Sequence, residues 1–200
     1  PTHRLWMSDR EQYLPPVQVG DVMRGGTLGV VEQSRSDRFQ PGDIVKPMVG
    51  GWEAYTVADG KMVRPVDRHP DVPLSAYMSV LGSTGITAYF GLLDIGQPLN
   101  LNGRLSRCGM ISRYHDEGVM PGPKDFGRVL MKRLTVKGFI VLDYQKRFPE
   151  ALEALTGWVT ADQLQWKNHV VDGLDNALDG LSLLFSGGND GKLMVKVSEE

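Results

Sequence analysis

The sequence predicts a mixed α/β fold, and three observations lead to this prediction. Residues 17–66 hold short β-branched runs bounded by Gly, Pro and Asp, which is typical of strands joined by turns. Residues 73–95 change to the apolar spacing of a helix. From residue 104 onward, strand-like runs alternate with helical patterns, as in an α/β protein built on a parallel sheet.

The β-rich part is expected to form a small barrel or sandwich. Strands are predicted at 27–31 and 43–45, with turn chemistry just before the second, where Pro41 fixes φ and Gly42 supplies conformational freedom. Gly50 and Gly51 then separate residues 45–49 from an alternating stretch at 52–57. Residues 1–16 are polar and end in two prolines, which indicates a surface loop.

The helical stretch at 73–95 begins after Pro73 and stops at Gly96. Gly82 and Gly85 interrupt it, so two short helices or a kink are expected. Its apolar residues at helical spacing are Leu74, Tyr77, Met78, Leu81, Ile86, Tyr89, Phe90 and Leu93.

The pattern of predicted elements is interrupted near Pro98 and Leu99, at a position that we call the seam. The residues there lack the elements that the helix-like run before them and the strand-like run after them lead one to expect. After the seam, a strand is predicted at 104–111 and a helix at 125–133. A second apolar strand is predicted at Val136–Leu142, as a buried or an edge strand of a parallel sheet. The remaining predicted elements are helices at 149–164 and 174–185 and a strand at 192–197. The second part therefore resembles the late part of a nucleotide-binding sheet whose early part is absent.

Composition excludes several classes of protein. The 200 residues are 41% hydrophobic, which is enough for a core, and the formal net charge of −2 with scattered basic residues argues against a nucleic-acid partner. No apolar run is long enough to span a bilayer, and no signal peptide is visible. A single cysteine, Cys108, cannot form an internal disulfide, so a cytoplasmic location is expected. The chain begins at Pro1 without Met, which suggests that an N-terminal part is missing.

Known site motifs fit poorly. The Gly-rich stretch at 25–29 has the wrong spacing for a dinucleotide fingerprint, and residues 186–192 depart from a phosphate loop and fit a helix C-terminal turn. The four histidines are widely spaced and there is one cysteine, so no metal site is expected. Cys108 lies in an apolar run and is expected to be a buried, inert thiol. The segment from Cys108 to Tyr114 either brings backbone amides to a ligand at the end of a sheet or is simply a strand followed by a loop.

A set of motifs in a fixed order nevertheless resembles one family. The set comprises Trp6–Asp9, Tyr13–Pro16, Val22–Gly26, Pro41–Asp43, Leu81–Leu93, Cys108–Tyr114, Gly138–Val141 and Asn189–Lys192. With these motifs the chain resembles the zinc-free, NADP-dependent branch of the medium-chain dehydrogenase/reductases, and within it the alkenal double-bond and prostaglandin reductases.

The resemblance implies a GroES-like, β-rich catalytic domain plus a Rossmann-type parallel sheet of which only the last strands and helices remain. The expected division is a GroES-like domain over residues 1–98, a Rossmann remnant over 99–165, and a return to the catalytic domain over 166–200. The residues that would sort NAD from NADP fall in the missing part, on the order of a hundred residues.

The resemblance also implies roles for particular residues. Tyr114 is the expected catalytic residue, which orients the substrate carbonyl or assists protonation. The residues expected to contact NADP(H) are Cys108, Gly109, Met110, Ile111, Ser112, Tyr114, Phe139, Ile140, Val141 and Asn189. Trp52, Tyr55 and Tyr13 are candidates for the substrate wall, with ordinary packing as the alternative. Thr2 stands where many relatives have a tyrosine that contacts substrate, so substrate preference stays open.

The implied reaction is transfer of hydride from NADPH to the carbon–carbon double bond of an α,β-unsaturated aldehyde or ketone. The expected partners are that small molecule and a second copy, paired through the edge strand near Val136–Leu142. A non-catalytic GroES-like binding module and one piece of a split enzyme are the alternatives, because most of the cofactor domain is absent.

Overall fold

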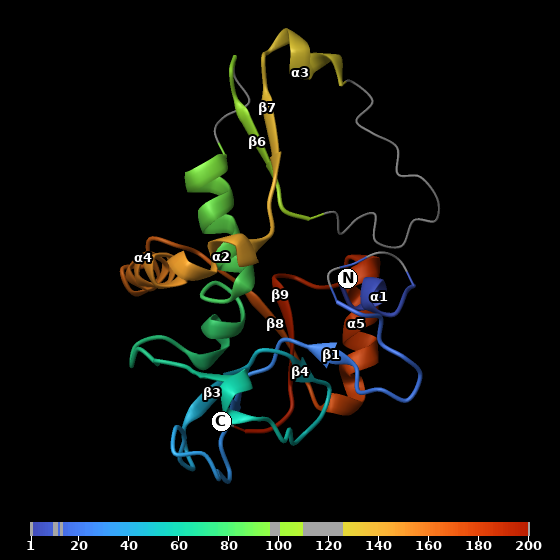
Figure 1. Ribbon diagram of the computed structural model, residues 1–200, viewed down its shortest axis with the longest axis vertical. Helices are drawn as coiled ribbons and strands as arrows, with labels where there is room; N and C mark the ends of the chain where they lie inside the picture. Colours follow the sequence, from blue (N-terminus) through green and yellow to red (C-terminus); the bar gives the residue numbers. More distant parts are fainter. Residues whose placement is uncertain (1, 10–11, 13, 97–100, 110–125, 200) are drawn as a thin grey trace. The chain divides into compact units, whose positions relative to one another are not determined.

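The computed structural model describes residues 2–9, 12, 14–96, 101–109 and 126–199. The chain forms two compact units: unit 1 comprises Pro1–Met78 and Lys167–Glu200, and unit 2 comprises Ser79–Trp166 (Figure 1). The predicted mixed α/β fold is confirmed, since antiparallel and parallel strand pairs occur together with helices. None of the described helices has both the length and the apolar character needed to cross a bilayer.

The first part of unit 1 is built from short antiparallel strands. β1 (Arg24–Gly25) pairs with β4 (Gly50–Gly51), and β2 (Gly29–Val30), β3 (Ile44–Pro47) and β5 (Val63–Pro65) form a sheet in the order β2-β3-β5. The predicted strands around residues 27–31 and 43–45 are confirmed in part. The remaining elements here are the helix α1 (Thr2–Trp6) and the 3₁₀ turns η1 (Gly60–Met62) and η2 (Leu74–Met78).

Two expectations for this region are wrong. Residues 52–57 form no strand, because Gly50 and Gly51 are themselves the strand that pairs with β1, and the chain turns away after Trp52. Gly50 is needed there: a Cβ atom at this position would lie 1.9 Å from Thr27 Oγ1. The expected loop over residues 1–16 is also interrupted, since Thr2–Trp6 is helical.

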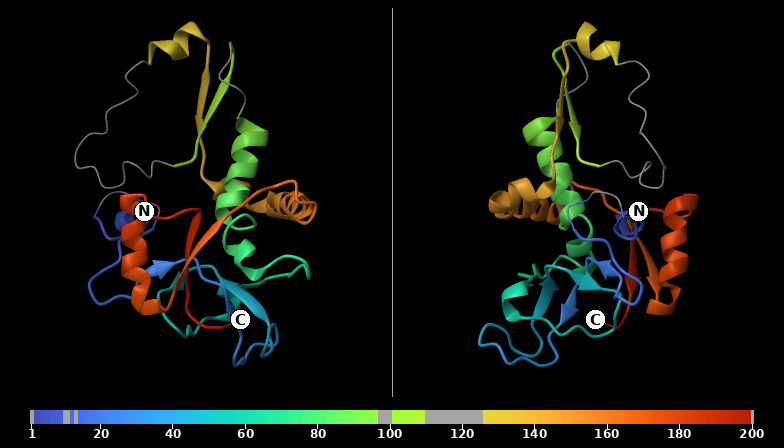
Figure 2. Two further views of the ribbon diagram at one scale, coloured as in Figure 1. Left: turned by 180° about the vertical axis from the view of Figure 1, so that it is seen from behind. Right: turned by 45° about the vertical axis from the view of Figure 1, so that its right-hand side comes forward.

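The C-terminal part of unit 1 is a β–α–β segment (Figure 2). β8 (Asn168–Asp172) pairs in parallel with β9 (Lys192–Lys196), and the connection contains the turn η6 (Leu174–Asn176) and the helix α5 (Ala177–Ser186). Gly187 ends α5 with φ of 72°, the left-handed conformation that glycine adopts without strain. The predicted helix and final strand are confirmed, whereas β8 was not predicted.

Unit 2 starts with the helix α2 (Ser83–Phe90), which continues as a π-helical turn, η3 (Gly91–Ile95). The predicted interruption at Gly82 is confirmed, because Gly82 precedes the first turn, but Gly85 lies inside α2. The order β6 (Arg104–Arg107), α3 (Gly127–Met131), β7 (Thr135–Gly138), η5 (Val141–Arg147) and α4 (Phe148–Thr160) confirms the predicted strand–helix alternation. The buried apolar residues are Leu81, Ile86, Phe90, Ile95, Phe139, Ala151 and Leu155.

The strand predicted over Val136–Leu142 is wrong in its second half. β7 ends at Gly138, and Val141 and Leu142 lie in the 3₁₀ turn η5. The local cause is Asp143, whose carboxylate accepts a hydrogen bond from the Ile140 backbone N–H at 3.1 Å and so favours a turn over an extended strand. All four residues of β7 are exposed, which agrees with the edge alternative of this expectation and not with a buried strand.

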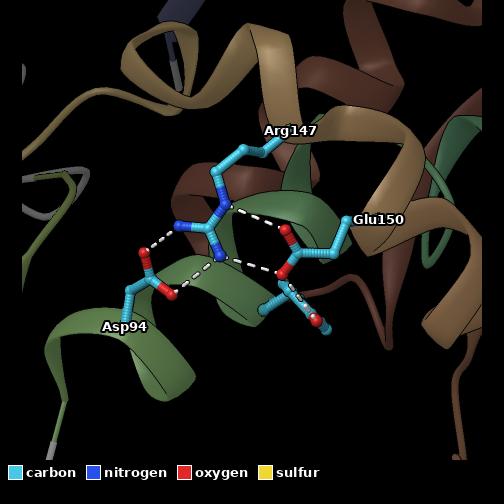
Figure 3. Close-up of polar contacts among 4 residues, drawn as sticks. Asp94, Arg147 and Glu150 are labelled. Atoms are coloured by element: carbon cyan, nitrogen blue, oxygen red, sulfur yellow. Dashed lines mark hydrogen bonds and ion pairs between the residues drawn. The ribbon is translucent and has the colours of Figure 1, made fainter.

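Arg147 links the end of the α2–η3 helix to α4 (Figure 3). Its guanidinium donates hydrogen bonds to Asp94 and to both carboxylate oxygens of Glu150, at 2.8 Å each for the latter. Its charge also lies over the Phe90 ring, 4.9 Å from the centroid. These hydrogen bonds lower the pKa of the Glu150 carboxyl, so the pair stays charged over the physiological pH range. Arg147 thus links the end of η3 to the first turn of α4.

Candidate active site

The carboxyl ends of the two parallel strands in unit 2 meet at one edge. Arg107 is the register partner of Gly138, and the Phe139 backbone N–H donates to the Arg107 carbonyl at 3.1 Å. Cys108 and Gly109, which follow β6, therefore emerge beside Phe139 and Ile140, which follow β7. In open α/β sheets, ligands bind outside the carboxyl ends of the strands. Unit 2 thus brings together five of the residues predicted to contact a cofactor, namely Cys108, Gly109, Phe139, Ile140 and Val141.

Within this group, Phe139 and Ile140 face different surroundings. Phe139 is 8% exposed, and its ring meets the edge of Tyr144 with centroids 5.6 Å apart. A Cβ atom at Gly91 would lie 3.3 Å from the Phe139 ring, so the helix end closes over it. Ile140 is 49% exposed. Phe139 is therefore a core residue that supports the edge, while Ile140 is available to a ligand.

The thiol of Cys108 is exposed, which corrects the expectation of a buried cysteine. The reason is that β6 ends at Arg107, so Cys108 lies beyond the last paired residue and is not covered by a neighbouring strand. Met110, Ile111, Ser112 and the predicted catalytic residue Tyr114 lie outside the described residues. Their roles stay predictions.

Asn189 belongs to unit 1, in the turn between α5 and β9. Its side-chain amide donates to the Gly191 carbonyl at 2.9 Å, which leaves its own carbonyl oxygen as an acceptor. The next residue, Asp190, donates its backbone N–H to His169 Nδ1 at 3.3 Å and forms an ion pair with Lys167. The turn is thus held by its own polar contacts, with Gly191 at φ of 95°.

The candidates for the substrate wall do not form one group. Trp52 packs against His3, with ring centroids 5.4 Å apart, and against Gly25, where a Cβ atom would lie 3.2 Å from the Trp52 ring. Tyr55 is 74% exposed and Tyr13 lies outside the described residues. Trp52 therefore has a packing role in unit 1.

Sequence reasoning missed the aromatic cluster around His3. His3 also meets the Trp6 ring edge at 5.2 Å, and its Nδ1 and the Trp6 Nε1 are buried with no hydrogen-bond partner within the described part of the chain. Burial lowers the pKa of His3 to about 4, so the imidazole is neutral at physiological pH. The signal that could have found this cluster is the spacing of His3 and Trp6 on one turn of a helix.

The described residues fit a nicotinamide dinucleotide only in part. The edge formed by Cys108, Gly109 and Ile140 offers backbone groups and an exposed apolar side chain, which suits the flat end of such a cofactor. Phosphates are usually held by a Gly-rich turn between a strand and a helix N-terminus. In the part of unit 2 that the structure describes, neither strand is followed directly by such a turn. The described residues of unit 2 therefore form no binding site for the adenine half of a dinucleotide.

Comparison with known proteins agrees with the resemblance. Residues 1–66 match the model of an N-terminal domain of oxidoreductases. The NADPH-dependent curcumin reductase of Escherichia coli is 27% identical, over 99% of this chain and 84% of that protein. The NADP(+)-dependent 2-alkenal reductase of Nicotiana tabacum is 24% identical, over 94% of this chain and 81% of that protein. A crystal structure of CurA from Vibrio vulnificus in complex with NADPH matches with a TM-score of 0.87 and 25% identity, covering 100% of this chain and 87% of that one.

The alignments also show how many residues of the relatives have no counterpart in this chain. The match to the E. coli protein extends over 293 positions, while this chain has 200 residues, so about 95 positions have no counterpart here. The match to a putative NADP-dependent oxidoreductase of Bacillus subtilis, YfmJ, extends over 292 positions and leaves about 92 unmatched. Both values agree with the predicted loss of on the order of a hundred residues.

Proposed function

We propose that this chain, a member of the zinc-free medium-chain dehydrogenase/reductase group, is the catalytic part of an NADPH-dependent reductase of conjugated carbon–carbon double bonds. The observation that carries the proposal is the edge in unit 2 where Cys108 and Gly109 meet Phe139 and Ile140 at the carboxyl ends of two parallel strands. The names of the relatives support it, since they include curcumin, 2-alkenal and prostaglandin reductases.

The cofactor is NADP(H), because the named relatives are NADPH-dependent and the matching CurA structure holds NADPH. When bound, the cofactor would supply the hydride that the carbon β to the substrate carbonyl takes up. The chain's own contribution at this edge would be to bind and orient: Ile140, half exposed, would offer an apolar contact, and Phe139, packed against Tyr144, would support the backbone beside it. Asn189, in unit 1, is proposed as a cofactor contact from the family resemblance alone; its side-chain amide donates to the Gly191 carbonyl, which leaves its carbonyl oxygen as an acceptor.

Tyr114 is the proposed catalytic residue. As hydride reaches the β carbon, the electron pair of the double bond moves toward the carbonyl oxygen, which becomes an enolate oxygen. A phenol that donates a hydrogen bond to this oxygen stabilises the charge where it develops, and loss of one such donor in an enzyme costs about 2.7–4 kcal/mol. Tyr114 or a water molecule then supplies the proton that the α carbon takes up.

The test measures the reduction of a simple α,β-unsaturated ketone by the loss of NADPH absorbance, and the product is identified as the saturated ketone. The assay uses a chimeric protein in which the nucleotide-binding residues that this chain lacks are taken from the E. coli relative and inserted at the seam near Pro98 and Leu99. Tyr114→Phe should lower kcat at least tenfold, while Tyr89→Phe, whose hydroxyl donates to Glu150 on α4, should leave it nearly unchanged. A joined protein that binds NADPH but reduces no enone would refute the proposal.

A non-catalytic binding module is the second candidate, and the unmatched positions of the relatives favour it. The chain would then keep the GroES-like part without cofactor affinity. Titration of the 200-residue chain with NADPH, monitored by fluorescence, distinguishes the two candidates.

A homodimer through the strand near Val136–Leu142 stays part of the proposal. Its pairing strand is β7, residues 135–138, since the strand ends at Gly138.

A further inference from the structure

The parallel pair β6–β7 is uncovered to an unusual degree. Parallel sheets are normally buried on both faces, and a lone two-stranded sheet is marginally stable in water. Here Leu105 and Val136 are register partners, so they lie on the same face, and they are 37% and 46% exposed. The edge of β6 that faces away from β7 pairs with no strand in the part of the chain that the structure describes.

The helix α3, which connects the two strands, is also exposed to solvent. α3 lies between β6 and β7 in the chain, and none of its residues is buried, with Leu130 78% exposed. Met131 and Phe126 are also exposed, as is Leu101 just before β6. A surface of this kind marks an interaction site in a folded protein. We call residues 101–109 and 126–138 the open sheet.

The open sheet is also strongly basic. It carries six basic residues and no Asp or Glu, although the whole chain has a net charge of −2. These residues are Arg104, Arg107, Arg128, Lys132, Arg133 and Lys137, and all are exposed. Arg128 and Lys132 already interact within the chain, so the charge argument rests on Arg104, Arg107, Arg133 and Lys137. With these four the surface suits a partner that is apolar and acidic. A second copy fits badly at the β6 edge, because pairing β6 with its own twin would bring arginines face to face. The proposed homodimer uses the other strand of the pair, β7.

The size and the strand order point to one occupant. The relatives carry about 95 positions that this chain lacks, which corresponds to about three β–α units of roughly 30 residues. In a doubly wound sheet with the order 3-2-1-4-5-6, the fourth strand pairs with the fifth on the side away from the sixth. If β6 is the fifth strand of this order and β7 the sixth, the fourth strand belongs at the uncovered edge of β6, and the other missing strands follow beyond it.

We propose that the open sheet binds a separate polypeptide that carries the missing nucleotide-binding strands, with the uncovered edge of β6 as the pairing strand. The two chains together then form the complete cofactor site, which one chain holds only in part. This inference rests on the proposed function, because it takes the missing positions to be the cofactor-binding part of the same reductase.

The experiment uses the full 200-residue chain with an affinity tag. It is co-expressed with a polypeptide made of the unmatched positions of the E. coli relative, and in parallel with that of the B. subtilis relative. At least one polypeptide should copurify in a one-to-one ratio, and the complex should bind NADPH at least tenfold more tightly than the tagged chain alone. Leu105→Glu and, as a milder second variant, Arg107→Glu should each lower copurification at least tenfold. Leu178→Glu, on an exposed site of α5 in unit 1, is the matched control and should copurify normally.

Three outcomes overturn the inference. One is that neither polypeptide copurifies with the wild-type chain. Another is that Leu105→Glu and Arg107→Glu, folded by circular dichroism, copurify as well as Leu178→Glu. The third is that the tagged chain alone binds NADPH as tightly as any mixture. A one-to-one complex that binds NADPH but reduces no enone supports the inference and refutes the proposed function instead.

Discussion

Phe139 and Ile140 are adjacent in the chain, yet the structure gives them opposite roles, and their variants test this directly. Phe139 is 8% exposed, against Tyr144 and under the end of α2, so Phe139→Ala should lower the free energy of unfolding by about 3–5 kcal/mol. Of this, the edge contact with Tyr144 contributes about 0.5–1.5 kcal/mol. Phe139→Leu keeps most of the apolar volume and should cost about 1–1.5 kcal/mol.

Ile140 is half exposed, so Ile140→Ala loses little burial and should cost about 1 kcal/mol or less. If Ile140 contacts the cofactor, this variant should instead weaken NADPH binding, measured on the protein joined with the missing residues. Stability is measured by urea unfolding with far-ultraviolet circular dichroism, and the variants are compared only where the slope with urea is unchanged.

The reasoning fails if the two effects are exchanged. A Phe139→Ala protein within 1 kcal/mol of the wild type that has lost NADPH affinity would make Phe139 a binding residue. An Ile140→Ala protein destabilised by 3 kcal/mol would place Ile140 in the core. Leu92→Ala, on the exposed side of η3, serves as a control for non-specific effects and should change stability by less than about 0.5 kcal/mol.

Three further outcomes are expected. Tyr114→Phe should reduce kcat for an enone at least tenfold with little change in NADPH affinity; a near-normal rate would remove the phenol from the chemistry. The pKa of His3 is about 4 in the fold and about 6.5 unfolded, so the unfolded state binds more protons between these values and the free energy of unfolding should fall as the pH drops from 6.5 to 4. His3→Leu should flatten that dependence in urea titrations, and an unchanged slope would contradict it. Gly50→Ala should destabilise by about 1–3 kcal/mol because its Cβ meets Thr27, whereas Gly29→Ala, with open space around it, should be nearly neutral by thermal unfolding.

The sequence predicted the fold best where periodicity is strong. The helical spacing before Gly96 and the alternation of strands and helices after residue 104 both correspond to observed elements. Pattern reasoning failed where a single local contact decides. Asp143 turns the chain at Ile140 despite its apolar neighbours. Gly50 and Gly51 form a strand although glycine disfavours one, and larger side chains are excluded there by Thr27 at Gly50 and by Val22 at Gly51.

The candidate site was predicted from the family resemblance more than from residue chemistry. The residues Cys108, Gly109, Phe139 and Ile140 lie together at the carboxyl ends of β6 and β7, and their contact with a cofactor stays a prediction. Which of them faces a ligand depends on packing that no spacing reveals. The exposed thiol of Cys108 illustrates this, since its surroundings in the sequence are apolar while its strand ends one residue earlier.

Unit 1 consists of two stretches of chain that are far apart in sequence, residues 1–78 and 167–200. The strands β1 to β5 all find their pairing partners within residues 24–65, so this antiparallel part can pair early in synthesis. The contact of the Arg4 guanidinium with the Phe185 ring, 6.0 Å from its centroid, forms only after α5 has left the ribosome. We therefore expect the N-terminal strands to fold early in translation and the completion of unit 1 to be a late step.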